Sequence, residues 1–184
     1  MHAAAMLYTD PQRERHMVHP RPLSLLVLLI LWPLCSASMA QDDLTISKLT
    51  HIDLQYMQQQ RDSLNALTAR NFGGQLNGSK DKDLALLQRL LDENIVSGNQ
   101  TSELQAMGIV MGDLLASELS LDWVVYEDRY GRTRALRYKS TDSYLFPVTM
   151  ISRRREVDDR TPVADIYRRA RDTLRAAIPA LPFQ

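Results

Sequence analysis

The segment from Thr101 to Leu119, TSELQAMGIVMGDLLASEL, is the feature that most limits how this chain can fold. Its apolar residues recur with the spacing of an α-helix, and Ile109 and Val110 make its centre apolar on nearly every side. A helix of this kind has to be buried, so the rest of the chain must supply elements that pack around it. The segment therefore predicts one core built around a central helix.

Two glycines interrupt this predicted helix, Gly108 and Gly112, and they lie one turn apart. A glycine in a helix interior costs roughly 1 kcal/mol relative to alanine. We expect the cost to be offset by close approach of another part of the backbone to the flattened face. A phosphate-binding loop is the alternative, but there the glycines precede a helix rather than interrupt it.

Helical periodicity predicts three further helices, at about 46–70, at about 80–94 and after Thr161. Ser79 stands where an N-cap would begin the second helix. For the last helix, Thr161 is the expected cap and Pro162 the expected first residue.

A hairpin is predicted from segments 121–128 and 132–138, with Tyr130–Gly131 at the turn, and segment 143–146 reads as a third strand. Segment 152–160 reads as a charged loop. The predicted class is α+β, with N-terminal helices, a small antiparallel β-meander of about three strands and a C-terminal packing helix.

The first forty residues have the pattern of a signal peptide. A run of twelve uncharged, mostly apolar residues, Leu23 to Leu34, is followed by small residues that end at Ala40. The run is shorter than the roughly 20 residues that span a membrane, so we expect cleavage and a single periplasmic or secreted domain at 41–184. An uncleaved anchor, lipidation of Cys35 and a true start at Met17 are the alternatives.

Composition narrows the chemistry of the mature chain. Over all 184 residues the formal net charge is +0 at pH 7, and this near-neutral balance gives no support for binding nucleic acid. Beyond Ala40 the chain has one histidine, His51, and no cysteine, so we expect no cofactor, no metal site of the His/Cys kind and no disulfide. Basic residues gather in 119–184, which suits an anionic partner, and a solvated mixed-charge surface is the alternative.

Paired acids for catalysis are not evident. Glu127 and Asp128 are adjacent in a predicted strand, so their side chains point to opposite faces and cannot flank one scissile bond. We lean against an enzyme. The alternative is an envelope hydrolase whose carboxylates converge only in the fold.

A binding surface is predicted on the hairpin. If Gly131 ends a three-residue turn, Tyr126 lies opposite Arg134, and Arg132 and Tyr138 share that face. These four residues would suit a peptide or an anionic glycan. A shift of one residue in register would separate them, and the last helix covering this face is the alternative.

A second candidate is the sequence SRRR at 152–155, which has the guanidinium groups to clamp a carboxylate or phosphate. A solvated loop is the alternative.

The middle of the chain resembles a known family. From about Lys80 to Ala170, a glycine-bearing helix, a strand opened by tryptophan, an acidic turn with glycine and a Phe-Pro followed by arginines are similar to the bacterial family catalogued as domain of unknown function 3806. The matching positions are Gly108, Gly112, Trp123, Glu127, Asp128, Gly131, Phe146, Pro147, Arg153 and Arg154. The resemblance implies a family without an established activity, so it supplies no catalytic or binding residue.

We therefore expect an exported, non-catalytic binding module whose partner is an envelope protein or an anionic cell-wall component. The oligomeric state is left open.

Overall fold

The fold is taken from a computed structural model, which describes residues 44–178. The expected signal peptide, Cys35 and Met17 lie outside the described residues.

The described chain has five α-helices, one short 3-10 helix and four strands. In order, they are β1 (Thr45–Lys48), α1 (His51–Phe72), α2 (Lys80–Asp92), α3 (Thr101–Leu119), β2 (Asp122–Asp128), β3 (Gly131–Arg137), β4 (Tyr144–Leu145), η1 (Pro147–Thr149), α4 (Ser152–Glu156) and α5 (Val163–Ala177). The strands form one antiparallel sheet in the order β1-β2-β3-β4. The α+β class is confirmed, with four strands in place of about three.

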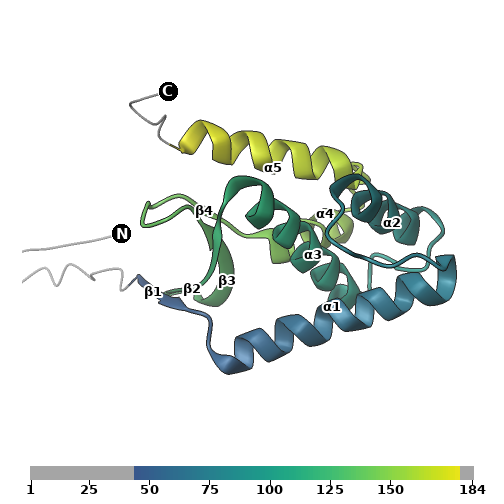
Figure 1. Ribbon diagram of the computed structural model, residues 1–184, viewed down its shortest axis with the longest axis horizontal. Helices are drawn as coiled ribbons and strands as arrows, with labels where there is room; N and C mark the ends of the chain where they lie inside the picture. The colour runs from purple at the N-terminus through teal and green to yellow at the C-terminus, as the bar shows by residue number, and fades with distance from the viewer. Residues whose placement is uncertain (1–43, 179–184) are drawn as a thin grey trace, which may run out of the picture. The chain divides into compact units, whose positions relative to one another are not determined.

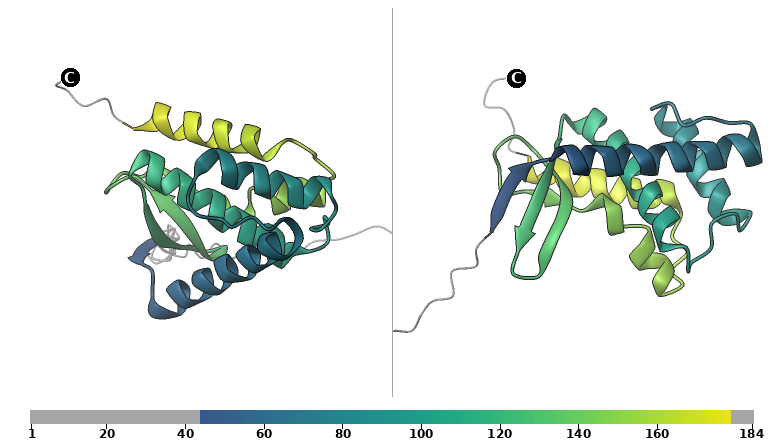
Figure 2. Two further views of the ribbon diagram at one scale, coloured as in Figure 1. Left: turned by 45° about the vertical axis from the view of Figure 1, so that its right-hand side comes forward. Right: turned by 90° about the horizontal axis from the view of Figure 1, so that it is seen from below.

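Helix α3 occupies the centre of the described chain, as its composition predicts. Figure 1 shows it with α1 on one side, α5 on the other and the sheet at one end. Most of its residues are buried, and Leu104, Met107, Ile109, Met111 and Leu115 have no exposed surface. The apolar residues on all sides of α3 can be buried because a different element covers each side of the helix (Figure 2).

The two glycines of α3 serve close packing; the predicted approach of another backbone is confirmed at Gly108, while at Gly112 the neighbour is a side chain. A Cβ atom on Gly108 would lie 2.5 Å from the carbonyl oxygen of Pro147 and 2.6 Å from that of Val148. A Cβ on Gly112 would lie 2.5 Å from the ring of Trp123. The helix is thus notched where η1 and the start of β2 cross it.

The prediction for the first helix is wrong at its start. Ile46 belongs to β1 and pairs with Tyr126 of β2, and the helix begins at His51. Thr50 caps it: its hydroxyl accepts the backbone N–H of Asp53, and the Asp53 carboxylate accepts the backbone N–H of Thr50. This reciprocal capping box separates the strand from the helix.

The last two elements also differ from prediction. Residues Ser152–Glu156 form the short helix α4 rather than a loop. Helix α5 begins at Val163 after Pro162, and Thr161 does not cap it. The N–H of Val163 is instead bound by the side-chain oxygen of Gln88 on α2, at 2.8 Å. A contact 75 residues away in sequence thus does what a local cap would do.

Glu118 ties α5 to α3. Its carboxylate accepts a 2.8 Å hydrogen bond from the Tyr167 hydroxyl and pairs with Arg175 at 3.0 Å and Lys80 at 3.4 Å. The Tyr167 hydrogen bond, helped by the nearby cations, lowers the pKa of Glu118.

Within residues 44–178, none of the helices combines the length and apolarity that crossing a bilayer requires.

Candidate functional site

Helix α4 carries three consecutive arginines that have three different surroundings. Arg154 is structural: it donates a 2.6 Å hydrogen bond to the carbonyl oxygen of Met150 and approaches Asp159 at 3.8 Å. The side chains of Arg153 and Arg155 make no hydrogen bond or ion pair within residues 44–178. Each of these two lines a different hollow. The candidate site is the hollow that contains Arg155.

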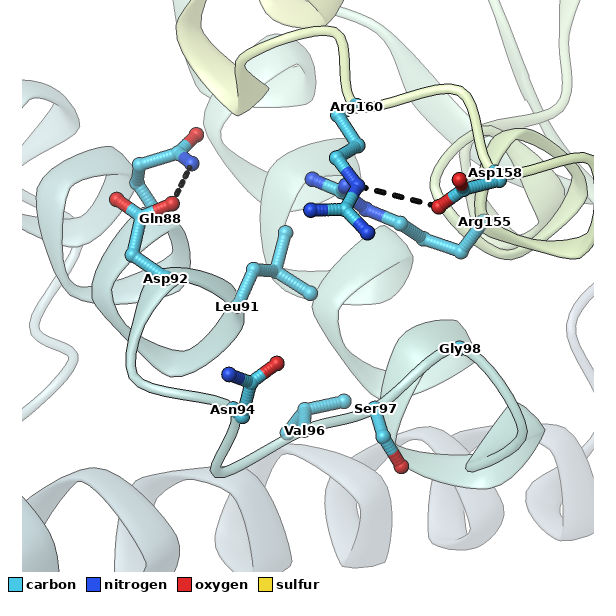
Figure 3. Close-up of a pocket in the computed structure, with 10 residues that line it drawn as sticks. All are labelled: Gln88, Leu91, Asp92, Asn94, Val96, Ser97, Gly98, Arg155, Asp158 and Arg160. Atoms are coloured by element: carbon cyan, nitrogen blue, oxygen red, sulfur yellow. Dashed lines mark hydrogen bonds and ion pairs between the residues drawn. The ribbon is translucent and has the colours of Figure 1, made fainter.

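This hollow has a volume of about 280 Å³ and lies between α2, the loop that leads into α3, and the segment that joins α4 to α5 (Figure 3). Figure 3 shows the side chains of Arg155 and Arg160 reaching toward its centre, with Leu91 pointing toward them from α2. Its lining is Gln88, Leu91, Asp92, Asn94, Val96, Ser97, Gly98, Arg155, Asp158 and Arg160.

Two groups in the hollow are available to a ligand. The guanidinium of half-buried Arg155 has its donors unused by residues 44–178, and the side-chain amide of Asn94 makes no hydrogen bond to them either. An arginine fork with an amide beside it suits the two oxygens of a carboxylate or a phosphate. Leu91 and Val96 add a small apolar surface that can contact the carbon next to such a group.

The hollow also contains two acids, and both are engaged. Asp92 accepts a 2.7 Å hydrogen bond from the side-chain amide of Gln88. Asp158 pairs with Arg160 at 3.1 Å, and both side chains of this pair are about four-fifths exposed. Such an exposed ion pair contributes little to stability, so a ligand anion can take the place of the Asp158 carboxylate on Arg160.

The four residues predicted as a binding surface on the hairpin do not share one face. Strands β2 and β3 are joined by two residues, not three, so Tyr126 pairs with Thr133 and Arg134 pairs with Val125. The predicted register is therefore wrong by one residue. Tyr126 lies on the face opposite to Arg132 and Arg134, since alternate residues of a strand face opposite ways.

The two hairpin arginines bind Asp53 of α1. Arg132 makes a bidentate contact with the Asp53 carboxylate at 2.9 and 2.6 Å, and Arg134 approaches it at 2.9 Å. Asp53 is 1% exposed, and hydrogen bonds from Arg132 and Thr50 hold its pKa well below the usual range. These arginines neutralise a buried carboxylate and attach α1 to the hairpin. A ligand-binding role for them stays a prediction.

Tyr138 lies just past the end of β3, where it packs against the core, and the ammonium of Lys139 lies 5.2 Å from its ring centre. The ring of Tyr126 packs edge-on against the rings of Tyr144 and Phe146, with 5.1 Å between ring centres in both pairs. The aromatic residues of the predicted surface are thus distributed over two places.

Another hollow, between α1 and α3, collects three carboxylates, from Asp62, Asp83 and Asp113. All three are engaged. Asp113 accepts from Arg61 at 2.6 Å and from the Trp123 indole at 3.0 Å, while Asp62 and Asp83 accept from the Gln58 amide and from backbone N–H groups, respectively. Nowhere in 44–178 do three or more His, Cys, Asp or Glu side chains assemble a metal-binding group.

Residues 83–167 match the family model described as domain of unknown function (DUF3806). This confirms the resemblance seen in the sequence, and the residues that line the Arg155 hollow, 88–160, all lie within the DUF3806 match.

A solved crystal structure from Bacteroides thetaiotaomicron VPI-5482 is similar in fold, with a TM-score of 0.64 at 16% sequence identity. The similarity covers 71% of this chain and 48% of the other, so this chain spans about half the length of that protein. An identity this low shows the shared fold and nothing of function. No curated protein matches the chain significantly.

The arginine run at 152–155 was the one sequence signal for the hollow. Its role as a clamp was predicted from composition, but Asn94 and Arg160 were not predicted, because they are distant in sequence and meet Arg155 only in the fold.

Proposed function

We propose that the chain is an exported, non-catalytic binding module that holds an anionic group of an envelope protein or of a cell-wall polymer in the Arg155 hollow. The observation that carries the proposal is the guanidinium of Arg155, which is half-buried and makes no hydrogen bond or close ion pair within residues 44–178, with only a longer-range attraction to the Asp159 carboxylate. Removing an arginine from bulk water without pairing it is unfavourable, so a ligand that supplies the missing acceptors gains free energy. The signal-peptide pattern of residues 1–40 supports export.

The alternative of an envelope hydrolase draws on the hollow with three acids. Its carboxylates, however, are bound by Arg61, Trp123, Gln58 and backbone N–H groups, which leaves no free acid–base pair there. A general acid or base must exchange its proton with a substrate, and acids held in this way are better suited to joining α1, α2 and α3. The binding proposal is therefore favoured.

Site-specific photo-crosslinking in living cells tests the proposal. A photoreactive residue replaces Asp92, an exposed residue at the rim of the hollow, in the otherwise unchanged chain and in the chain that also carries Arg155→Ala. The same residue at exposed Ala85, on α2 outside the hollow, is the control. We expect an adduct with one envelope protein or with cell-wall polymer from position 92, its loss with Arg155→Ala, and none from position 85. An adduct that persists with Arg155→Ala, or its absence from position 92, would overturn the proposal.

A further inference from the structure

The outer edge of β3 is largely uncovered near the hairpin turn. Strand β4 pairs only with Leu136 and Arg137, so within residues 44–178 no strand lies on the outer side of the stretch from Gly131 to Ala135. In a two-residue hairpin the residues that flank the turn, Asp128 and Gly131, exchange hydrogen bonds, and bonded pairs then alternate along the ladder. The backbone N–H and C=O groups of Arg132 and Arg134 therefore point outward.

These outward groups have no partner within residues 44–178. No backbone or side-chain hydrogen bond outside the β2–β3 ladder is made by the main chain of Arg132, Thr133 or Arg134. An uncovered edge of this kind is a template for one more strand. The part of the chain that the structure describes therefore leaves room for one more strand at this edge.

A second hollow, with a volume of about 440 Å³, lies along this uncovered edge. One wall is the hairpin, from Tyr126 across to Arg132 and Thr133, and the other is Phe146, Thr149 and Arg153. Arg153 is exposed and has no partner among the described residues. The hollow thus combines free main-chain groups, aromatic rings and an unpaired cation, and the carboxylate in its lining, Asp128, already accepts a 2.8 Å hydrogen bond from the backbone N–H of Tyr130.

We propose that this hollow binds an extended acidic peptide, which adds to β3 as a strand. Its main chain bonds the outward groups of Arg132 and Arg134, an acidic side chain pairs with Arg153, and an apolar side chain on the other side contacts Tyr126 and Phe146. Main-chain bonding gives affinity in such complexes, and the side-chain contacts select the sequence. This surface is separate from the Arg155 hollow, and its partner is an acidic segment of another protein.

Two other occupants fit less well. A glycan would use the rings and Arg153, but it has no regular row of N–H and C=O groups to match the edge. A second copy of the chain would offer its own edge strand, β1, whose residues Thr45–Lys48 carry a lysine and no acid to meet Arg153. Charge complementarity therefore favours an acidic peptide.

The test uses the mature chain and six-residue peptides of alternating valine and glutamate, with both ends blocked, in the two possible frames. Binding is followed by NMR, through the backbone amide shifts and hydrogen exchange of Arg132 and Arg134. We expect saturable shifts and at least about tenfold slower exchange at these two amides, since exchange requires an unbonded N–H. Methylating the peptide nitrogens of alternate residues provides the control for strand addition. Methylation of the nitrogens that face β3 should abolish binding. Methylation of the nitrogens that face away from β3 should change the dissociation constant by less than about twofold.

Three variants locate the peptide on the protein. Arg153→Ala should weaken binding about tenfold, which corresponds to one good charge-assisted contact. Two control substitutions should leave the affinity for the peptide unchanged. Arg169→Ala removes an exposed, unpaired arginine of α5, and Arg155→Ala removes the arginine of the other hollow. Failure of the binding proposal for Arg155 would therefore leave this result intact.

Several results would overturn the proposal: no saturable shift with either peptide at millimolar concentration, equal tolerance of methylation in both registers, or equal effects of Arg153→Ala and Arg169→Ala. Shifts at Arg132 and Arg134 with oligogalacturonate but not with the peptides would show a glycan site instead. Exchange protection that rises with protein concentration alone would show self-association.

Discussion

The carboxylate of Asp53 lies 2.6 Å from the guanidinium of Arg132, although the two residues are 79 positions apart in sequence. Asp53 belongs to the first turn of α1 and Arg132 to the start of β3, so this contact joins the N-terminal helix to the hairpin. Arg134 adds a second cation, and the capping box with Thr50 uses the remaining capacity of the carboxylate. The whole arrangement depends on one buried charge.

Asp53→Asn should lower the free energy of unfolding by about 2–3 kcal/mol. The asparagine keeps a capping oxygen for α1 but leaves two arginines without their anion, and such a loss costs more than an exposed pair. Urea denaturation followed by circular dichroism measures the change. Asp142→Asn, at a 96% exposed carboxylate 3.8 Å from Arg137, is the matched control and should change stability by less than about 0.5 kcal/mol. Equal effects of the two substitutions would contradict the account.

Stability should fall as the pH drops below about 4. Hydrogen bonds from Arg132 lower the pKa of Asp53 in the folded chain, and the Tyr167 hydrogen bond lowers that of Glu118. The unfolded chain binds protons at these carboxyls near pH 4, while the folded chain still holds them charged. Acid therefore favours the unfolded state, and the stabilisation is fully present only above that pH. Urea midpoints from pH 2.5 to 7 should fall less steeply for Asp53→Asn than for wild type. Parallel pH profiles would argue against a role for this carboxylate.

Gly108→Ala should destabilise the fold by about 2 kcal/mol or more. The new methyl group would lie within 2.6 Å of two backbone oxygens of η1, which cannot move aside as a flexible side chain would. Alanine improves helix propensity by about 1 kcal/mol, so the measured loss is net of that gain. Ser117→Ala, at an exposed position of the same helix, is the control and should be neutral or slightly stabilising. A stabilised Gly108→Ala variant would show that η1 does not press on α3.

Asp158→Asn should strengthen anion binding in the Arg155 hollow by about threefold to tenfold. The substitution removes the carboxylate that occupies Arg160 at 3.1 Å, and it lowers the negative charge next to the ligand. Residue 158 has a positive φ of 54°, which asparagine also adopts readily, so the backbone should be kept. Isothermal titration with inorganic phosphate measures the change. Unchanged or weaker binding would mean that Asp158 does not compete with the ligand.

The core could be predicted from the sequence where one segment carries the information. Apolar residues on nearly every side of 101–119 identified the central helix, and Gly108 predicted the close backbone approach that Pro147 and Val148 provide. Both inferences depend on local periodicity and on the size of one side chain.

Features that depend on distant contacts were missed. Strand β1 was taken for helix because Ile46, Leu49 and Ile52 have helical spacing, while its pairing with β2 lies about 80 residues away. A local signal for the boundary existed in Thr50 and Asp53, which have the spacing of a capping box. The start of α5 was misplaced for the same reason, since Gln88 of α2 binds its first N–H.

In the candidate site, too, the features that depend on distant contacts could not be predicted from the sequence. A one-residue difference in turn length separated Tyr126 from Arg132 and Arg134, because side chains alternate along a strand. A helix of five residues is too short for its sequence periodicity to show which of its three arginines is structural. Arg154 is recognised as the structural one only by its contacts with Met150 and Asp159.

Binding of an anionic ligand by the Arg155 guanidinium is tested most directly by NMR of the arginine side chains. The Nε–Hε resonance of Arg155 is followed while inorganic phosphate or glutarate is added at constant ionic strength, with Arg169 as the internal control. The account predicts a saturable shift at Arg155, a similar saturation point at the Asn94 amide, and only a small linear drift at Arg169. Identical drifts at Arg155 and Arg169 would contradict it, because they would show that the hollow holds an anion no better than an open surface does.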